Sequence, residues 1–206
     1  MKKIIAIGGI IILVGVLGYF IFGKKDLVKN VPLKNEKIII FGDSLAEGIG
    51  ATSGNDIATL MEKRFKKAVL NYGKSGDTTR DALDRLPLAL EEDPGIALII
   101  LGGNDVLKKV PKEETFQNLE KIINLFQDQG AAVVLVGVRS GLIGDGRGDD
   151  YVSLADKTQS AYMPDILNDV FGKRQYMSDA IHPNDAGYRL IERRMSPIID
   201  ELFSDK

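Results

Sequence analysis

From residue 37 onward the chain repeats one pattern: a short apolar run of strand length, then a longer stretch whose apolar residues recur at helical spacing. The expected strands are Lys37–Phe41, Ala68–Tyr72, Ile96–Leu101, Ala131–Val138 and a short fifth strand at Gln175–Met177. Largely continuous apolar strands that alternate with helices predict a parallel sheet covered on both faces. We therefore expect an α/β fold with three layers (α/β/α), flavodoxin-like, whose doubly wound five-stranded sheet has the order 2-1-3-4-5.

Helices are predicted between these strands by apolar residues spaced three and four apart. Their expected ranges are Asn55–Lys67, Thr79–Glu91, Glu113–Gln129, Leu154–Phe171 and a last helix that starts at Asn184 or Asp185. Pro87, Pro164 and Pro197 fall inside these helices and are expected to kink or interrupt them. The segment Leu142–Tyr151 is rich in Gly and Asp and is interpreted as a surface loop.

The N-terminus is set apart by nineteen uncharged residues, Ile4 to Phe22, which lie between lysines on both sides. A helix of this length spans roughly 28 Å, close to the hydrocarbon core of about 30 Å. We expect a signal-anchor or transmembrane helix at 1–23, a tether at 24–36 and a globular domain at 37–206. No small-x-small cleavage site follows the apolar run, so secretion after cleavage is the alternative. The domain is expected outside the cytoplasm, in a periplasm or at the cell surface.

Composition excludes several classes of function. Lys and Arg number 27 against 29 Asp and Glu, for a net charge of −2, so no nucleic-acid partner is expected. The chain has no Cys, which excludes disulfides and thiolate chemistry. His182 is the only histidine, so it is the only imidazole base available and a multi-histidine metal site is excluded. We expect no cofactor and no metal, and a monomer.

Four short polar segments stand where the predicted order brings the chain to one crevice. Ser44 follows the first strand, Ser75-Gly76-Asp77 the second and Gly102-Gly103-Asn104-Asp105 the third, while Asp179-Ala180-Ile181-His182-Pro183 precedes the last helix. Strand one lies between strands two and three in this order, so their loops open side by side at the carboxyl edge, where ligands bind in such sheets.

These residue types suit acyl transfer, which needs a nucleophile, a base, a group that orients the base, and donors for an oxyanion. Ser44 can be the nucleophile, His182 the base and Asp179 its partner. The oxyanion donors would be the backbone N–H groups of Ser44 and Gly76 and the side-chain amide of Asn104.

The same residues are also compatible with structural roles and with different chemistry. Asp179 can serve the start of a helix and Asn104 a turn. Asp43, Asp105 and Asp179 can instead be Mg²⁺ ligands in a phosphohydrolase, with no clear task for Ser44. A non-catalytic binding module on a membrane stalk is the third possibility.

The four segments, with Gly42-Asp43-Ser44-Leu45 as the first, resemble the motif blocks of the SGNH, or GDSL, hydrolase family in order and spacing. The resemblance extends from Lys37 to Phe203 and is greatest to the bacterial thioesterase I/lysophospholipase group, an arylesterase-like branch. It implies an α/β/α esterase without a metal, acting on substrates such as lysophospholipids, aryl esters or acyl thioesters. It also implies the residue roles given above; acetyl esters of cell-wall glycans are the alternative substrates.

Overall fold

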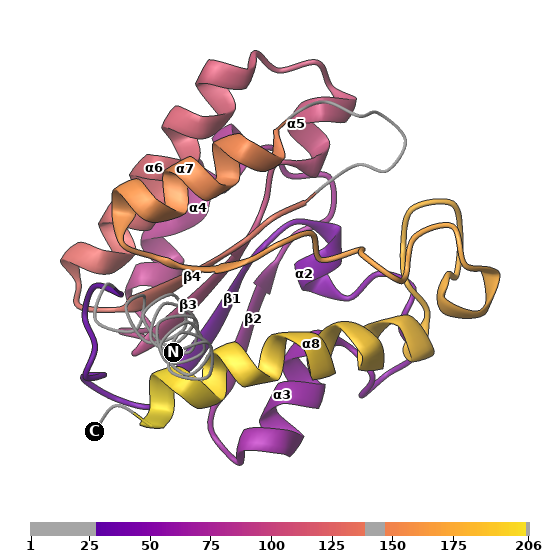
Figure 1. Ribbon diagram of the computed structural model, residues 1–206, viewed down its shortest axis with the longest axis horizontal. Coiled ribbons are helices and arrows are strands. Elements are labelled where there is room, and N and C mark those ends of the chain that lie inside the picture. Colours follow the sequence, from indigo (N-terminus) through magenta and orange to yellow (C-terminus); the bar gives the residue numbers. More distant parts are fainter. Residues whose placement is uncertain (1–27, 139–146, 205–206) are drawn as a thin grey trace, which may run out of the picture.

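A computed structural model describes residues 28–138 and 147–204. Its centre is a parallel sheet of five strands in the order β2-β1-β3-β4-β5, as predicted (Figure 1). The strands are β1 (Ile38–Gly42), β2 (Val69–Gly73), β3 (Ile96–Ile100), β4 (Ala132–Val136) and β5 (Ala161–Met163).

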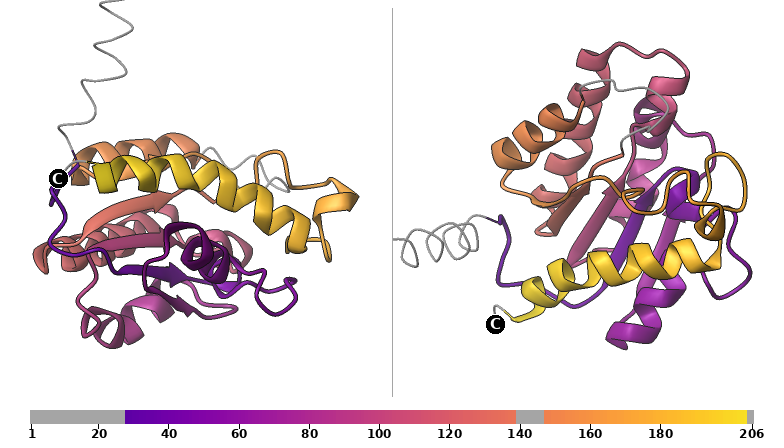
Figure 2. Two further views of the ribbon diagram at one scale, coloured as in Figure 1. Left: turned by 90° about the horizontal axis from the view of Figure 1, so that it is seen from below. Right: turned by 45° about the vertical axis from the view of Figure 1, so that its right-hand side comes forward.

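Helices cover both faces of this sheet and complete the three layers (Figures 1 and 2). Helices α3 and α8 pack together on one face, and α4, α6 and α7 on the other. The helices are α2 (Ser44–Glu47), α3 (Ile57–Phe65), α4 (Thr79–Leu90), α5 (Gly103–Leu107), α6 (Lys112–Asp128), α7 (Gly148–Thr158) and α8 (Asp185–Ser204), with a short 3₁₀ helix η2 (Arg174–Tyr176).

The first strand shows why its run is apolar throughout. Successive side chains of a strand point to opposite faces of a sheet. Ile38 and Ile40 belong to the apolar cluster that includes α3 and α8, whereas Ile39 and Phe41 belong to the cluster with α4, α6 and α7. All four side chains are fully buried. The two-sided burial expected for a covered parallel sheet is therefore present in β1.

The prediction of the fifth strand is wrong. The strand is Ala161–Met163, inside the segment expected to be helical, and Gln175 lies in the 3₁₀ helix η2. Helix α7 ends earlier than expected because Gln159 adopts a left-handed conformation (φ 51°). A strand of only three residues has no long apolar run, so its pattern is compatible with the continuation of a helix.

The prediction of a loop over Leu142–Tyr151 is wrong at its C-terminal end, since α7 begins at Gly148; residues 139–146 lie outside the described part. Asp149 and Asp150, which suggested a loop, lie in the first turn of α7, where acidic side chains favour a helix. Tyr151 is buried and its hydroxyl donates to the carbonyl oxygen of Leu101 at 2.7 Å.

Two of the prolines do not interrupt their helices. Pro87 lies inside α4 and Pro197 inside α8, and both helices continue past them. Both prolines are exposed, so water can satisfy the carbonyl group that loses its backbone partner.

Residues 28–36, predicted as part of a tether, are attached to the globular domain. The amide of Asn30 donates to the carbonyl oxygens of Gln127 (2.7 Å) and Ala131 (2.9 Å), and Ala131 directly precedes β4. The chain therefore enters the domain at the amino ends of the strands. The predicted membrane helix at 1–23 lies outside the described residues; within 28–138 and 147–204, no helix has the length and apolar character needed to cross a bilayer.

Candidate active site

Ser44 is held at the carboxyl edge of the sheet by a close contact between β1 and α2. It is the first residue of α2, and Asp43 caps the helix by accepting a hydrogen bond from the backbone N–H of Leu45 at 3.0 Å. A Cβ atom on Gly42 would lie 2.2 Å from the carbonyl oxygen of Ile100. Glycine is therefore required at position 42 for the chain to turn from β1 into α2 beside β3.

A chain of hydrogen bonds joins Ser44 to residues 138 positions further along. The Nε2 atom of His182 lies 3.0 Å from Ser44 Oγ, and its Nδ1 atom lies 2.8 Å from Asp179 Oδ2. Both distances are within the range expected of a nucleophile, its base and the group that orients the base. Ser44 is buried, the His182 side chain is 18% exposed and that of Asp179 is 53% exposed.

The carboxylate of Asp179 is fixed by the backbone of its own loop. Its Oδ1 atom accepts hydrogen bonds from the N–H groups of Ile181 and His182, both at 2.7 Å. The bonds from the His182 side chain, then from the backbone N–H groups of His182 and Ile181, lower the pKa of Asp179 to about 2. Asp179 is therefore ionised at every pH above about 4, and its oxygen atoms act only as acceptors.

The loop that carries Asp179 and His182, residues 177–183, is closed by contacts between its two ends. The backbone N–H of Ser178 donates to the carbonyl oxygen of His182 at 2.9 Å, and Met177 and Pro183 form an isolated antiparallel bridge. Asn184 then caps α8, since its side-chain oxygen accepts from two N–H groups of the first turn. These contacts fix the position from which His182 reaches Ser44.

Asn104 and Gly76, the predicted oxyanion donors, lie on neighbouring loops. The side-chain amide of Asn104 donates to the carbonyl oxygen of Asp77 at 3.0 Å and so joins the two loops. Gly76 has φ 84°, and its carbonyl oxygen accepts a hydrogen bond from Lys108 Nζ at 2.8 Å. Asn104 and Ser44 line the same crevice, whereas Gly76 is not among the residues that line it.

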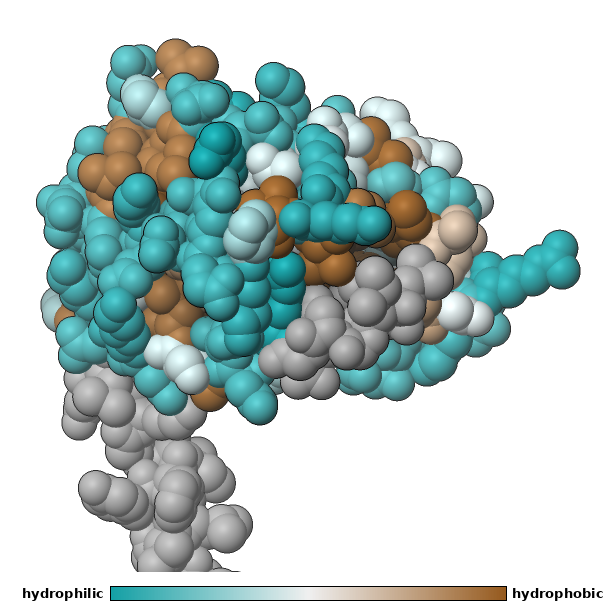
Figure 3. Space-filling view, turned by 90° about the horizontal axis from the view of Figure 1, so that it is seen from above, coloured by the Kyte–Doolittle hydropathy of each residue, from teal (hydrophilic) through white to brown (hydrophobic). Residues whose placement is uncertain are grey.

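Most of the side chains that line this crevice are apolar. The lining residues are Asp43, Ser44, Leu45, Gly103, Asn104, Leu107, Val138, Leu167, Phe171 and Ile181. Leu107 is 50% exposed and Ile181 39% exposed, so the apolar lining reaches the surface. Figure 3 shows a patch of apolar side chains exposed beside polar ones on one face of the domain. The site therefore offers an apolar wall beside a serine hydroxyl.

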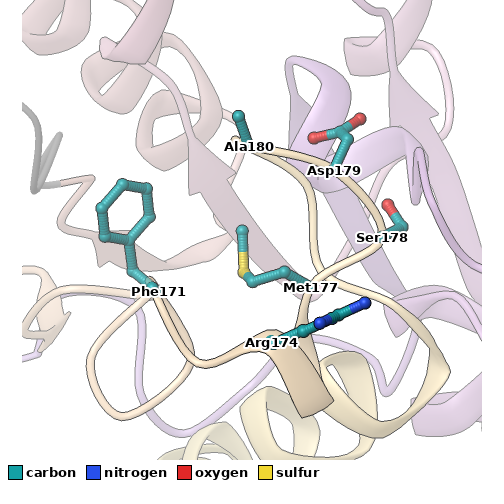
Figure 4. A pocket seen from close by; sticks show the side chains of 7 residues that line it. Phe171, Arg174, Met177, Ser178, Asp179 and Ala180 are labelled. Atoms are coloured by element: carbon teal, nitrogen blue, oxygen red, sulfur yellow. The ribbon is translucent and has the colours of Figure 1, made fainter.

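Phe171 also lines a second hollow on the outer side of the His182 loop. Figure 4 shows Met177 between Phe171 and Ser178, with Asp179 at the rim. Arg174 extends beside Met177 and is exposed. This hollow therefore adjoins the crevice but does not contain Ser44.

The carboxyl groups of Asp77 and Asp105 lie close enough to Asp43, the residue before Ser44, to affect its charge, but these groups do not form a metal site. Both oxygens of Asp105 accept hydrogen bonds from Thr79, at 2.9 Å from its N–H and 2.6 Å from its hydroxyl. Asp179 is bound to His182. Nowhere in the described ranges do three metal-ligating side chains come together as a bound metal ion requires. The hypothesis of a Mg²⁺ site at Asp43, Asp105 and Asp179 is therefore not supported by the positions of these residues.

Asp43 is the buried carboxyl group closest in sequence to Ser44. Burial, and then the carboxylates of Asp105 and Asp77, raise its pKa, while the hydrogen bond from Leu45 and the charge of His182 lower it; the balance is a pKa of about 7. This pKa lies above the ordinary value of 3.8, so the folded protein binds the Asp43 proton more tightly than the unfolded chain does. The resulting contribution to the free energy of unfolding is complete below about pH 4. It is lost as the pH rises through about 7.

Asp43→Asn is expected to remove this pH dependence. The wild-type free energy of unfolding should fall by roughly 3 kcal/mol from pH 5 to pH 8 through Asp43, since each pKa unit corresponds to about 1.4 kcal/mol. The neutral amide can still accept the hydrogen bond from Leu45 and has no proton to lose. Urea unfolding at both pH values measures the effect, with the exposed Asp84→Asn on α4 as the control. An equal fall in Asp43→Asn and wild type would contradict the assignment.

Arg85 contacts the residues that support the site, although the sequence pattern does not single it out. It is mostly buried and bonds to the ends of β1 and β2 and to Asp77. A charged residue in a helix normally lies on the solvent face. Only its spacing indicates burial: Arg85 lies three residues after Ala82 and four before Ala89, so it shares a helix face with these two buried residues.

Comparison with known proteins gives one consistent result. Residues 40–190 match the model of the GDSL-like Lipase/Acylhydrolase family. The chain is 34% identical to an arylesterase of Vibrio mimicus over 72% of this chain and 80% of the relative. It is 31% identical to esterase TesA of Pseudomonas aeruginosa over 82% and 90%, and 30% identical to thioesterase 1/protease 1/lysophospholipase L1 of Escherichia coli K12 over 72% and 76%.

Solved structures extend the likeness to three dimensions. The crystal structure of TesA superposes with a TM-score of 0.72 at 28% identity and covers 81% of this chain and 99% of its own. The esterase EstA from Pseudoalteromonas sp., inhibited by monoethylphosphonate, superposes with a TM-score of 0.75 at 25% identity and covers 82% and 100%. The chain therefore belongs to the GDSL-like lipase/acylhydrolase family of ester hydrolases.

Proposed function

We propose that this protein hydrolyses carboxylic esters or thioesters through an acyl-enzyme at Ser44. The observation that carries the proposal is the hydrogen-bonded chain from Ser44 Oγ through His182 to Asp179, in a member of an ester-hydrolase family. The names of its relatives, which include arylesterase, esterase and thioesterase, agree with this reaction class.

The proposed reaction has two stages. Ser44 Oγ attacks the carbonyl carbon while His182 Nε2 takes the hydroxyl proton, and the tetrahedral intermediate then expels the alcohol or thiol, which receives that proton. Water attacks the acyl-enzyme in the second stage, with His182 again as the base. The acid leaves, and the Ser44 hydroxyl is restored. Asp179 accepts from Nδ1 and so keeps Nε2 free to accept the proton.

The oxyanion of the intermediate needs donors near Ser44. Helix α2 begins at Ser44, so the backbone N–H of Ser44 has no partner within the helix. The Asn104 amide carries two N–H groups: one donates to Asp77, and the other, which has no partner among the described residues, would donate to substrate. We include the N–H of Gly76, on the loop that Asn104 contacts, as the third donor.

Asn104→Ala is expected to lower kcat by about 10²–10³-fold, the usual effect of losing one oxyanion donor, with a smaller change in KM. Steady-state hydrolysis of p-nitrophenyl butyrate measures both constants. Asn168→Ala is the matched control, because this exposed asparagine bonds only the neighbouring Asp169 through its side chain among the contacts of the described residues. A kcat within threefold of wild type for Asn104→Ala would exclude its side chain as a donor.

The apolar wall of the crevice favours substrates with an apolar acyl or aryl group. Leu107, Leu167 and Ile181 would contact such a group beside Ser44. The acetyl esters of cell-wall glycans are the second candidate, because an acetyl group is too short to need apolar contacts along the crevice. Rates for p-nitrophenyl esters from acetate to palmitate distinguish the two: a maximum above four carbons supports acyl esters, and a maximum at acetate supports the glycan substrate.

A fluorophosphonate probe tests the reaction itself. We expect wild-type protein to become labelled, with the added mass on the peptide that contains Ser44, and to lose ester turnover in proportion to labelling. Protein that carries no label and hydrolyses no ester of any length would contradict the proposal and favour the non-catalytic binding module.

We also propose that residues 1–23 anchor the protein in a membrane, with 37–206 as a monomeric hydrolase domain outside the cytoplasm. The support is the run of nineteen uncharged residues from Ile4 to Phe22, with Lys2 and Lys3 before it and Lys24 and Lys25 after Gly23; cleavage and secretion are the alternative. Asn30 contacts the domain beside the start of β4, and Ser44 follows the end of β1. Residue 28 lies on the side of the domain away from α2, the helix that begins with Ser44 (Figure 1), so an anchor that precedes it would join the domain on that side.

A further inference from the structure

One buried guanidinium connects the loops that carry the proposed catalytic groups. Arg85 Nε donates to Asp77 Oδ2 at 2.5 Å, Nη1 to the carbonyl oxygen of Tyr72 at 2.8 Å, and Nη2 to the carbonyl oxygen of Gly42 at 2.7 Å. Gly42 ends β1 two residues before Ser44, and Tyr72 lies near the end of β2. The Arg85 side chain is only 17% exposed, so these three bonds are largely protected from water.

Asp77 extends this connection to the third loop. Its carboxylate accepts from Arg85, while its backbone carbonyl accepts from the side-chain amide of Asn104 at 3.0 Å. The Asp77 side chain is buried. The position of the Asn104 amide therefore depends on a residue that Arg85 holds.

The surroundings of Arg85 allow little freedom of position. Its guanidinium lies 4.5 Å from the centre of the Phe41 ring, which is fully buried in the core. Thr78, directly after Asp77, caps α4, the helix that carries Arg85. The planar guanidinium presents its donors in a fixed fork, so the directions to Gly42, Tyr72 and Asp77 are set together. A lysine ammonium is a point charge on a flexible stem and cannot reproduce that arrangement.

We propose that Arg85 is a positioning residue that sets the separation between Ser44 and the side-chain amide of Asn104, the oxyanion donor that Asp77 contacts. Arg85 is not among the residues that line the crevice, so it acts through Gly42 and Asp77 rather than on substrate. This inference rests on the proposed ester hydrolysis at Ser44. Small errors in such positions matter, because a displacement of about 1 Å can lower a rate by about 10²-fold.

Arg85→Lys is the first test. It keeps the positive charge beside Asp77 and removes the fixed fork. Rates are expressed per active site, counted by fluorophosphonate titration, so that unfolded molecules do not contribute. We expect kcat to fall by about 10–100-fold with KM changed by less than about threefold. Arg80→Lys is the matched control on the same helix, because Arg80 is 72% exposed and pairs with Glu114; its kcat should stay within twofold of wild type.

A double-mutant cycle with Asn104→Ala then separates positioning from general stability. If Arg85 acts by positioning the Asn104 amide, Arg85→Lys should lower kcat by less than about threefold once Asn104 is already Ala. The inference is overturned by equal fold losses in the two backgrounds. It is also overturned by a wild-type kcat per titrated site accompanied only by a lower melting temperature.

A second variant keeps the test valid if Arg85→Lys does not fold. Asp77→Asn keeps the backbone carbonyl that Asn104 uses and removes the charge that Arg85 pairs with, so kcat should fall by about 3–10-fold, again less after Asn104→Ala. Equal losses in both backgrounds contradict the inference. The two proposals fail separately: turnover that survives Ser44→Ala rejects the proposed function, whereas normal kcat in Arg85→Lys, with Ser44→Ala inactive, rejects only the positioning role.

Discussion

Ser44→Ala is expected to lower kcat for ester hydrolysis by roughly 10⁵–10⁶-fold, the effect of removing the nucleophile from a serine hydrolase that works as a unit with its base. His182 would then lose the hydroxyl that it is proposed to deprotonate, since Ser44 Oγ is its bond partner at Nε2. The proposed oxyanion donors would stay in place, so a residual rate of about 10³–10⁴-fold over water is expected. Hydrolysis of p-nitrophenyl butyrate by purified protein measures the loss.

Ser75→Ala serves as the control for Ser44→Ala. Ser75 is exposed on the neighbouring loop, and its backbone N–H, not its hydroxyl, makes the bond to Glu47. Its kcat should stay within threefold of wild type, and fluorophosphonate labelling should persist. Ser44→Ala should lose the label but keep the wild-type melting temperature within a few degrees, because one buried oxygen atom is removed without new steric conflict. Turnover above one hundredth of wild type, as an order-of-magnitude limit, would mean that Ser44 is not the nucleophile.

The sheet order was predictable because burial on both faces leaves a direct trace in the sequence. Ile38 and Ile40 pack toward α3 and α8, and Ile39 and Phe41 toward α4 and α6, so every position of β1 is apolar. The edge strand β5 leaves no such trace, because it has three residues and is paired on one side only. The strand can form only because α7 ends at Thr158, and that end depends on the left-handed conformation of Gln159. Glutamine is not one of the residue types that are typical of turns, so the sequence does not predict the end of the helix there.

The site was predictable to the extent that its residues follow strand ends. Ser44 and Asn104 line one crevice because parallel strands end at one edge, and His182 reaches Ser44 from the loop before α8. Arg85 was not predictable in this way. Two of its three partners are backbone carbonyl oxygens, which any residue supplies, so the contacts leave no pattern of residue types.

Asp179→Asn is expected to lower kcat by roughly 10³–10⁴-fold with little change in KM. Asp179 Oδ1 accepts from the N–H groups of Ile181 and His182, so the amide oxygen of asparagine should keep this position. The NH₂ group would then replace Oδ2, which lies 2.8 Å from His182 Nδ1. It would donate to Nδ1 and leave the imidazole proton on Nε2, where the ring can no longer accept a proton from Ser44. The 53% exposure of the Asp179 side chain admits water, which favours the lower end of the range.

Asp185→Asn is the control for this variant, because Asp185 is another carboxylate that binds a loop, through Thr52 at 2.7 Å from both its N–H and its hydroxyl. Its kcat should remain within threefold of wild type. The rate of fluorophosphonate labelling gives an independent measurement, since it depends on the same proton transfer from Ser44 to His182. We expect Asp179→Asn to slow labelling by a factor similar to the loss in kcat. Labelling and turnover both within tenfold of wild type would show that His182 holds its reactive tautomer without Asp179, and the role of Asp179 would then be confined to closing its own loop.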